Sequence, residues 1–175
     1  MSELYLFETE RLVLSGWRPE QLDDLVALHG NPNVTRYFSL GGAPWTRAQA
    51  AEALQHWIAL FESRQLGKLR LTRKSDGQFV GRAGFGIHPP TGEPEIGYAL
   101  LEEHQGAGYA TEAASGLRDW FFRAGKGDYF IGMADTRNAR SRAILSRIGM
   151  AETHVETAAD GRAVQFYHYE RPARG

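Results

Sequence analysis

The chain has 175 residues, of which 42% are hydrophobic and 23% charged, and its formal net charge is -1. These values are typical of one globular domain with a substantial core, so we expect a single domain over residues 1–175 that binds neither nucleic acid nor membrane. There is no cysteine, which excludes disulfides and a thiol nucleophile, and the N-terminus lacks the pattern of a signal peptide; we therefore expect a cytoplasmic protein.

The N-terminal third predicts one strand and two helices. Residues 11–15 alternate in strand fashion, and Pro19 suits the first turn of a helix that ends before the Asn-Pro-Asn segment. Thr46 and Gln49 form a capping-box pattern, which predicts the start of a second helix. Residues 35–45, rich in aromatic residues and glycine, are expected to form the loop between these helices.

The remainder predicts strands interrupted by two helices. In chain order we expect strands from 69 and at 79–87 and 96–101, a helix over 109–124, a strand at 129–134, a helix from Asn138, and two closing strands, the last at 164–169. The order β-αα-βββ-α-β-α-ββ predicts an α/β (α+β) protein whose mixed sheet has helices on both faces.

Residues 95–113 predict a strand, a glycine turn and a helix in succession. The first N–H groups of a helix have no internal partner and carry partial positive charge, so this device suits an anion. Gly106 and Gly108 allow a phosphate to approach the main chain. A dinucleotide-binding fold is disfavoured because Thr111 occupies the third glycine position and too few residues follow.

The motif Gln105-x-x-Gly108-x-Ala110 resembles the acyl-CoA loop of the GNAT N-acetyltransferase superfamily. Further segments resemble the RimJ/RimL-like branch of that superfamily in the expected order: residues 8–14, 95–98, 108–113 and 138–150. The resemblance implies an acyl-CoA N-acyltransferase fold with a mostly antiparallel sheet. It also implies acetyl-CoA as co-substrate, no metal, and direct attack of a primary amine on the thioester in a ternary complex.

The resemblance also implies a cofactor site. Backbone N–H groups would hold the pyrophosphate, with Thr111 as a hydroxyl donor, and the residues that supply them are Gln105, Gly106, Ala107, Gly108, Tyr109 and Ala110. The pantetheine arm would lie along Leu100 and Leu101, in a gap between that strand and the strand at 129–134, and would contact Asn138. Main-chain N–H groups of the central strand would bind the thioester carbonyl.

Glu95 and Ser141 are the candidate catalytic residues. A lysine-like amine costs roughly 4.6 kcal/mol to deprotonate at pH 7, against about 1 to 1.4 kcal/mol for an α-amine, so a general base matters more for a lysine-like acceptor. The family often places a carboxylate where Glu95 stands. Leu145 occupies the position of the tyrosine that many members use as general acid, and in the RimJ/RimL-like branch a serine at the position of Ser141 replaces it. The structural alternatives are a solvated glutamate at a strand end and a small residue in the first turn of a helix.

Other polar residues have weaker functional signals. Glu112 is expected to bond nearby backbone or an arginine, and His168 is a candidate for the acceptor side. Arg137, Arg140 and Arg142 are interpreted as a solvated basic face rather than as phosphate ligands. The loop at 33–44 occupies the acceptor side in the family, so some of its aromatic residues should contact substrate.

Several functions stay open from the sequence. The acceptor is a protein N-terminal α-amine or a small-molecule amine. A catalytically degenerate CoA-binding sensor of the same fold is the alternative, and a nucleotide-binding domain is a third reading. Exposed strand edges make a homodimer compatible with the chain.

Overall fold

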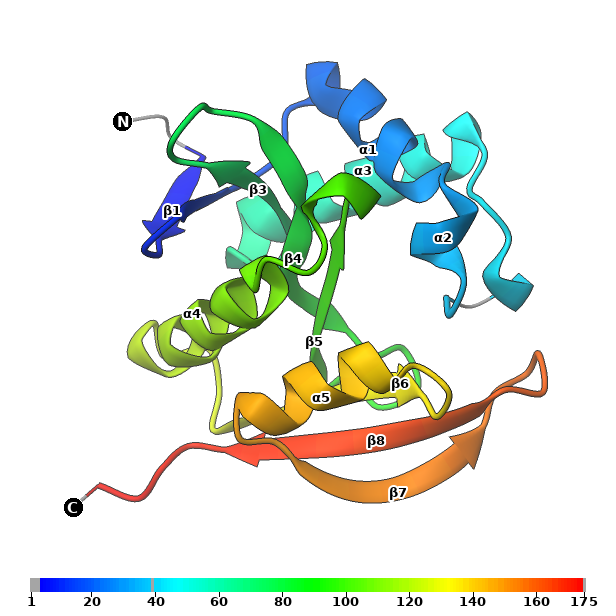
Figure 1. The fold of residues 1–175 in the computed structure, drawn as a ribbon. Helices are drawn as coiled ribbons and strands as arrows, with labels where there is room; N and C mark the ends of the chain where they lie inside the picture. The colour runs from blue at the N-terminus through cyan, green and yellow to red at the C-terminus, as the bar shows by residue number, and fades with distance from the viewer. Residues whose placement is uncertain (1–3, 39, 175) are drawn as a thin grey trace.

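The computed structural model describes residues 4–38 and 40–174 (Figure 1). Its strands are β1 (Tyr5–Glu8), β2 (Leu12–Ser15), β3 (Gly67–Arg73), β4 (Phe79–Ile87), β5 (Pro94–Leu100), β6 (Tyr129–Asp135), β7 (Ala151–Thr157) and β8 (Ala163–Glu170). Its α-helices are α1 (Leu22–His29), α2 (Pro32–Thr35), α3 (Arg47–Arg64), α4 (Tyr109–Arg123) and α5 (Ala139–Arg147).

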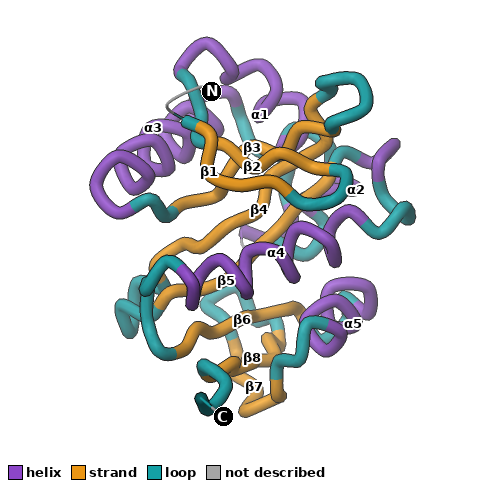
Figure 2. The backbone as a smooth tube through the Cα atoms, turned by 90° about the vertical axis from the view of Figure 1, so that its left-hand side faces the viewer, coloured by secondary structure: helices purple, strands orange, loops and turns teal. Residues whose placement is uncertain are grey.

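The strands form one eight-stranded sheet in the order β1-β2-β3-β4-β5-β6-β8-β7, which can be followed in Figure 2. All neighbours are antiparallel except β5 and β6, so the predicted mixed, mostly antiparallel sheet is confirmed. The prediction of a single strand before the helices was incomplete. Strand β1 was missed because it has only four residues and pairs with β2 through an irregular register.

Helices cover both faces of the sheet, as predicted. Residues of β5 face the two layers of helices in alternation. Ile96 and Leu100 belong to the core beneath α4 and α5, whereas Ala99 packs with residues of α1 and α3. Because side chains alternate along a strand, each β5 residue is assigned to one face by its position.

The predicted helix boundaries depend on local capping groups. Thr46 and Gln49 exchange both hydrogen bonds of the capping box at the start of α3. The side chain of Asn138 accepts a bond from the backbone N–H of Ser141 and so caps α5. The region after α1 differs from the predicted loop, because Pro32 begins the short helix α2. Ser39 of that region lies outside the described residues.

The parallel pair β5 and β6 is joined at only two positions, Glu95 with Ile131 and Ile96 with Gly132. Beyond Ile96 the two strands diverge, which confirms the predicted gap. Within the described ranges, no helix is long and apolar enough to cross a membrane.

Candidate active site

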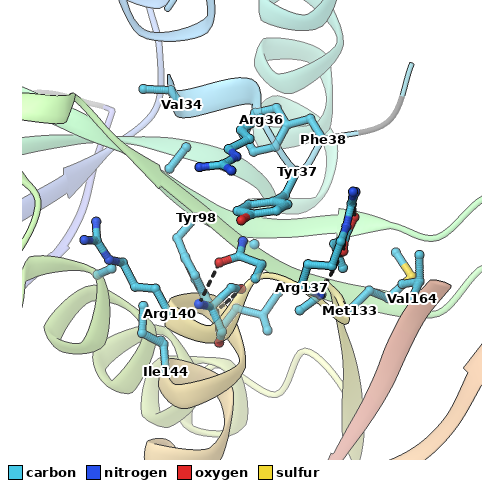
Figure 3. A pocket seen from close by; sticks show the side chains of 18 of the residues that line it. Val34, Arg36, Tyr37, Phe38, Tyr98, Met133, Arg137, Arg140, Ile144 and Val164 are labelled. Atoms are coloured by element: carbon cyan, nitrogen blue, oxygen red, sulfur yellow. Dashed lines mark hydrogen bonds and ion pairs between the residues drawn. The ribbon is translucent and has the colours of Figure 1, made fainter. Parts of the chain in front are cut away.

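A cavity of about 880 Å³ occupies the gap between β5 and β6 and continues toward α2. Figure 3 shows Arg36, Tyr37 and Phe38 on one side of this cavity, with Tyr98, Arg140 and Ile144 on the other. The cavity therefore runs between the two faces of the molecule that α1–α3 and α4–α5 cover. We call the portion beside α5 the cofactor half and the portion beside α2 the acceptor half.

The backbone of β5 presents polar groups to the gap. Leu101 donates its N–H to Val80 of β4, whereas the carbonyl of Leu100 accepts a bond from the Gln105 side chain on the opposite edge. Peptide groups alternate in direction along an antiparallel strand, so Tyr98 shares the direction of Leu100. Its N–H consequently faces the gap, where a thioester carbonyl would need a donor.

The turn before α4 is held in a conformation that requires glycine. Gly106 and Gly108 have φ angles of 85° and 84°, in the left-handed region. A Cβ built on Gly106 meets nothing within 4 Å, so the backbone angle rather than steric crowding excludes a side chain there. Gly108 stands at the N-cap of α4, which leaves that helix start without a capping side chain.

Glu112 fastens this turn to the N-terminal strands. Its carboxylate accepts bonds from Thr9 Oγ1 at 2.6 Å, from the Arg11 backbone N–H at 2.7 Å and from Arg11 Nε at 2.7 Å. Arg11 also donates to the carbonyl of Ala107 at 2.9 Å. Burial opposes ionisation of Glu112, but these bonds outweigh it and lower its pKa. The expected structural role of Glu112 is confirmed.

Gln105 connects the end of β5 to α5. Its Nε2 donates to the Leu100 carbonyl at 3.1 Å, and its Oε1 accepts from Arg140 at 2.6 Å. Arg140 is thereby directed to the cofactor half of the cavity, which it lines. Arg137 also lines the cavity but pairs with Asp135 at 2.8 Å, whereas Arg142 pairs with Glu152 and does not line it.

Ser141 lies beside the phenol of Tyr98. The Tyr98 hydroxyl is 3.0 Å from Ser141 Oγ and also donates to the Ser141 carbonyl at 3.0 Å. Burial raises the pKa of Tyr98. A protonated phenol is thus available to orient the serine hydroxyl, and Leu145, one helical turn further, is buried in the core.

Glu95 lies at the other half of the cavity with two cations, Lys68 of β3 and Arg82 of β4. Burial lowers the pKa of Lys68 to about 8 and that of Arg82 to about 10, while the Glu95 charge opposes both shifts. Arg82 Nε donates to His29 Nε2 at 3.2 Å, and burial, with a smaller effect of Arg82, lowers the pKa of His29 to about 2. His29 is therefore neutral and acts as an acceptor.

Aromatic side chains close the acceptor half. The Arg82 guanidinium lies 5.3 Å from the Phe38 ring and 5.6 Å from the Trp57 ring, and Phe38 and Trp45 both line the cavity. Across the cavity, Arg162 of the β7–β8 hairpin donates to the Tyr37 carbonyl at 2.9 Å. The segment after α2 is thus tied to the far end of the sheet.

Half of the candidate catalytic and cofactor-binding residues line this cavity. Those that line it are Glu95, Leu100, Gln105, Ala110, Asn138 and Ser141. Those that do not are Leu101, Gly106, Ala107, Gly108, Tyr109 and Thr111. Tyr109 is turned into the core, so any ligand contact it makes must come from its backbone. His168 stacks on Tyr129 and does not line the cavity.

The lining residues that the sequence analysis did not nominate for the site include Lys68, Arg82 and Tyr98. An arginine within the apolar strand 79–87 was a usable signal for Arg82, because a buried charge needs a partner or a function. Within the described part of the chain, no group of three or more His, Cys, Asp or Glu residues is arranged to hold a metal ion.

The mixed sheet, the divergence of β5 and β6, and the glycine turn at the start of α4 define the acyl-CoA N-acyltransferase fold. Residues 11–151 match the family described as the acetyltransferase (GNAT) domain. The chain belongs to this family and is an acyltransferase that uses acetyl-CoA.

Similar proteins agree with this family over nearly the whole chain. An uncharacterized N-acetyltransferase, p20, from Bacillus licheniformis is 28% identical over 97% of this chain and 95% of its own length. The crystal structure of an acetyltransferase from Agrobacterium tumefaciens str. C58 superposes with a TM-score of 0.82 at 26% identity, covering 98% of this chain and 99% of that one. RimL, a ribosomal α-N-protein acetyltransferase solved with coenzyme A, shares the fold with a TM-score of 0.78 at 18% identity, covering 95% and 97% of the two chains.

Proposed function

We propose that this protein transfers the acetyl group of acetyl-CoA to a primary amine by direct attack within a ternary complex, over one domain of residues 1–175. The observation that carries the proposal is the cavity through the β5–β6 gap, which has Glu95 at one half and Ser141 at the other. An amine that enters from the α2 side meets a thioester that enters from the α5 side. No covalent acetyl-enzyme is needed, which agrees with a chain that has no cysteine.

The cofactor half holds acetyl-CoA in this proposal. The pyrophosphate lies against the N–H groups of the turn at 105–110, at the positive end of α4, with Thr111 as an added donor and Arg140 alongside. The pantetheine arm follows Leu100 and Leu101 and reaches Asn138, whose Oδ1 is occupied by the α5 cap. Any bond from Asn138 to the arm therefore comes from its Nδ2.

The chemical step has three parts. Glu95 accepts a proton from the acceptor ammonium, directly or through a water molecule, and the neutral amine attacks the thioester carbon. The Tyr98 N–H stabilises the negative charge that develops on the carbonyl oxygen. As the tetrahedral intermediate collapses, the C–S bond breaks and Ser141 gives its proton to the departing thiolate. The Tyr98 phenol positions Ser141 for this step. The nitrogen loses its second proton at the same stage, and this proton restores the Ser141 hydroxyl through water. The products are the neutral amide, the free thiol of CoA and protonated Glu95.

Acetyl-CoA binding and acetyl transfer, measured on the same protein sample, test the proposal. Acetyl-CoA binding is measured by calorimetry, and thiol release is measured across a panel of small amines and N-terminal peptides. Gly108→Trp should abolish binding because it fills the phosphate approach and strains a φ of 84°. Gly77→Trp is the matched control, since Gly77 has a φ of 72° in the β3–β4 turn, away from the cavity.

Glu95→Gln separates catalysis from binding. We expect kcat to fall about 100-fold, the lower end of the range for a lost general base, with acetyl-CoA affinity unchanged. Binding without thiol release for any amine would instead indicate a CoA-binding sensor. Failure of the wild-type protein to bind acetyl-CoA would refute the assigned site.

A further inference from the structure

The acceptor half contains a buried guanidinium without a carboxylate partner. Arg82 is only 7% exposed, yet the ion pairs of the described residues do not include it. Its Nε is bonded to neutral His29. Its two terminal nitrogens make no hydrogen bond to a described residue and are not among the fully buried polar atoms, so they are open to the cavity that Arg82 lines. A cation that is largely withdrawn from water is stabilised by an anion, so this group favours an anionic ligand in the cavity.

Lys68 converges on the same place. A Cβ built on Gly97 would lie 2.6 Å from Lys68 Nζ and 3.6 Å from Arg82 Nη1, so both cations stand over this glycine of β5. The Lys68 ammonium has only two long contacts, each at 3.4 Å, to the carbonyls of Gly84 and Glu95. Two donors from different strands therefore share a position where the central strand has no side chain.

The other charged groups of the cavity are already engaged. Asp135 forms an ion pair with Arg137 and Arg162 forms one with Asp160, whereas Glu156 is hydrogen-bonded to His154. Arg140 is bonded to Gln105, and Arg36 stacks on Tyr37. The partners of Arg140 and Arg36 are neutral, so those two arginines keep their charges. At the shared position above Gly97, Lys68, Arg82 and the nearby Glu95 have a combined charge of +1. The reactive form of an amine that also carries a carboxylate has a charge of -1, which neutralises this group of three residues.

We propose that the acceptor amine carries a carboxylate within a few bonds of its nitrogen, and that Lys68 and Arg82 bind this carboxylate above Gly97 while Glu95 faces the amine. This inference rests on the proposed function and specifies its substrate class. Two sources supply the chemistry: a free amino acid, or a peptide whose first residue has an acidic side chain. Phe38 and Trp45 cover the apolar part of such a molecule.

The test compares acceptors that differ by one charge. Initial rates of thiol release are measured for free L-amino acids and for their carboxamides, and for peptides that begin with Asp or with Asn. The amine of the carboxamide is easier to deprotonate than the amine of the free acid, because a neighbouring carboxylate stabilises the ammonium form. Amine basicity alone therefore predicts a faster reaction for the carboxamide. We expect kcat/KM to be at least about 30-fold higher for the acid than for its amide, either for the free amino acids or for the Asp and Asn peptides. This ratio corresponds to about 2 kcal/mol of transition-state stabilisation that the uncharged form lacks.

Lys68→Met tests the assigned position. The methionine keeps an apolar stem and removes only long contacts, so the fold should persist. The ratio of kcat/KM for the acid to kcat/KM for the amide should fall to near unity, while the KM for acetyl-CoA stays constant. Arg82→Met should act in the same way, with circular dichroism to verify folding. Arg36→Met is the matched control, because it removes a cation that lines the same cavity but stacks on Tyr37.

The outcomes separate the two proposals. The carboxylate site is refuted if the wild type reacts equally fast with acids and amides. It is also refuted if the preference for acids survives Lys68→Met or is lost equally in Arg36→Met. None of these results contradicts acetyl transfer itself. If acetyl-CoA binds but no acceptor causes thiol release, the proposed acetyl transfer is wrong. Calorimetry with the same amino acids and Asp peptides on CoA-saturated protein then tests the carboxylate site alone. If these carboxylates bind to the wild type and binding is lost in Lys68→Met, the site is supported. If they do not bind to the wild type, the site is refuted.

Discussion

The two halves of the cavity are built in opposite ways. In the cofactor half, Gln105 uses both ends of its amide, and Glu112, which fastens the turn before α4, accepts three hydrogen bonds. In the acceptor half, the terminal nitrogens of Arg82 face the cavity without a hydrogen bond to a described residue, and His29 Nδ1 is buried without a partner among the described residues. A satisfied network holds a fixed shape for a common cofactor, whereas unsatisfied buried groups raise the free energy until a specific ligand pairs with them.

Ser141 gives the largest expected effect for the cofactor half. If Ser141 protonates the thiolate and Tyr98 only orients it, Ser141→Ala should lower kcat about 100-fold and Tyr98→Phe by less. The double variant should then be no slower than Ser141→Ala alone, which a double-mutant cycle of kcat measures. Ser146→Ala, an exposed position on the same helix, is the control. Additive losses would show that Tyr98 has a catalytic role of its own.

Glu112 tests whether the bonded network stabilises the cofactor half. Glu112→Ala should reduce the free energy of unfolding by about 2 kcal/mol, because it removes charge-assisted bonds to Thr9 and Arg11. Acetyl-CoA affinity should fall as well, since Arg11 also anchors the Ala107 carbonyl. Urea unfolding and calorimetry measure the two effects, with exposed Glu103→Ala as control.

The Glu112 effect has a defined dependence on pH. The pKa of Glu112 is lowered in the folded state, so its stabilisation is present above the pKa of the unfolded chain and is lost as pH falls through the folded value. The difference between wild type and Glu112→Ala should therefore shrink in acid. A difference that stays constant with pH would contradict the assigned ionic contribution.

His29 gives the smallest expected effect and belongs to the acceptor half. Its folded pKa of about 2 lies below the unfolded value near 6.5, so the unfolded chain binds the extra proton and stability falls as pH drops below 6.5. Between pH 7.5 and 5.5 this histidine should remove about 1.4 kcal/mol from the free energy of unfolding. His29→Gln keeps an acceptor for Arg82 without titrating, and should lose this component of the urea unfolding curves. An unchanged pH dependence would show that His29 does not titrate as its burial implies.

The sequence by itself determined the order of elements, the caps at Thr46 and Asn138, and the glycine turn before α4. Each depends on residues close together in the chain, where spacing and backbone preference determine structure. The cofactor half was predictable for the same reason, since residues 95–113 and the start of α5 supply most of it.

Only the tertiary structure brought Lys68, Arg82 and His29 together with Glu95. They come from β3, β4, α1 and β5. Strand pairing places Lys68 and Arg82 above Gly97, and the packing of α1 on this face brings His29 to Arg82. Residue spacing along one chain does not specify which strands become neighbours. Similarly, Tyr98 was visible as a motif residue, but its contact with Ser141 depends on the packing of α5 against the sheet. The acceptor half was therefore decided by long-range contacts, which arise only when the sheet has assembled.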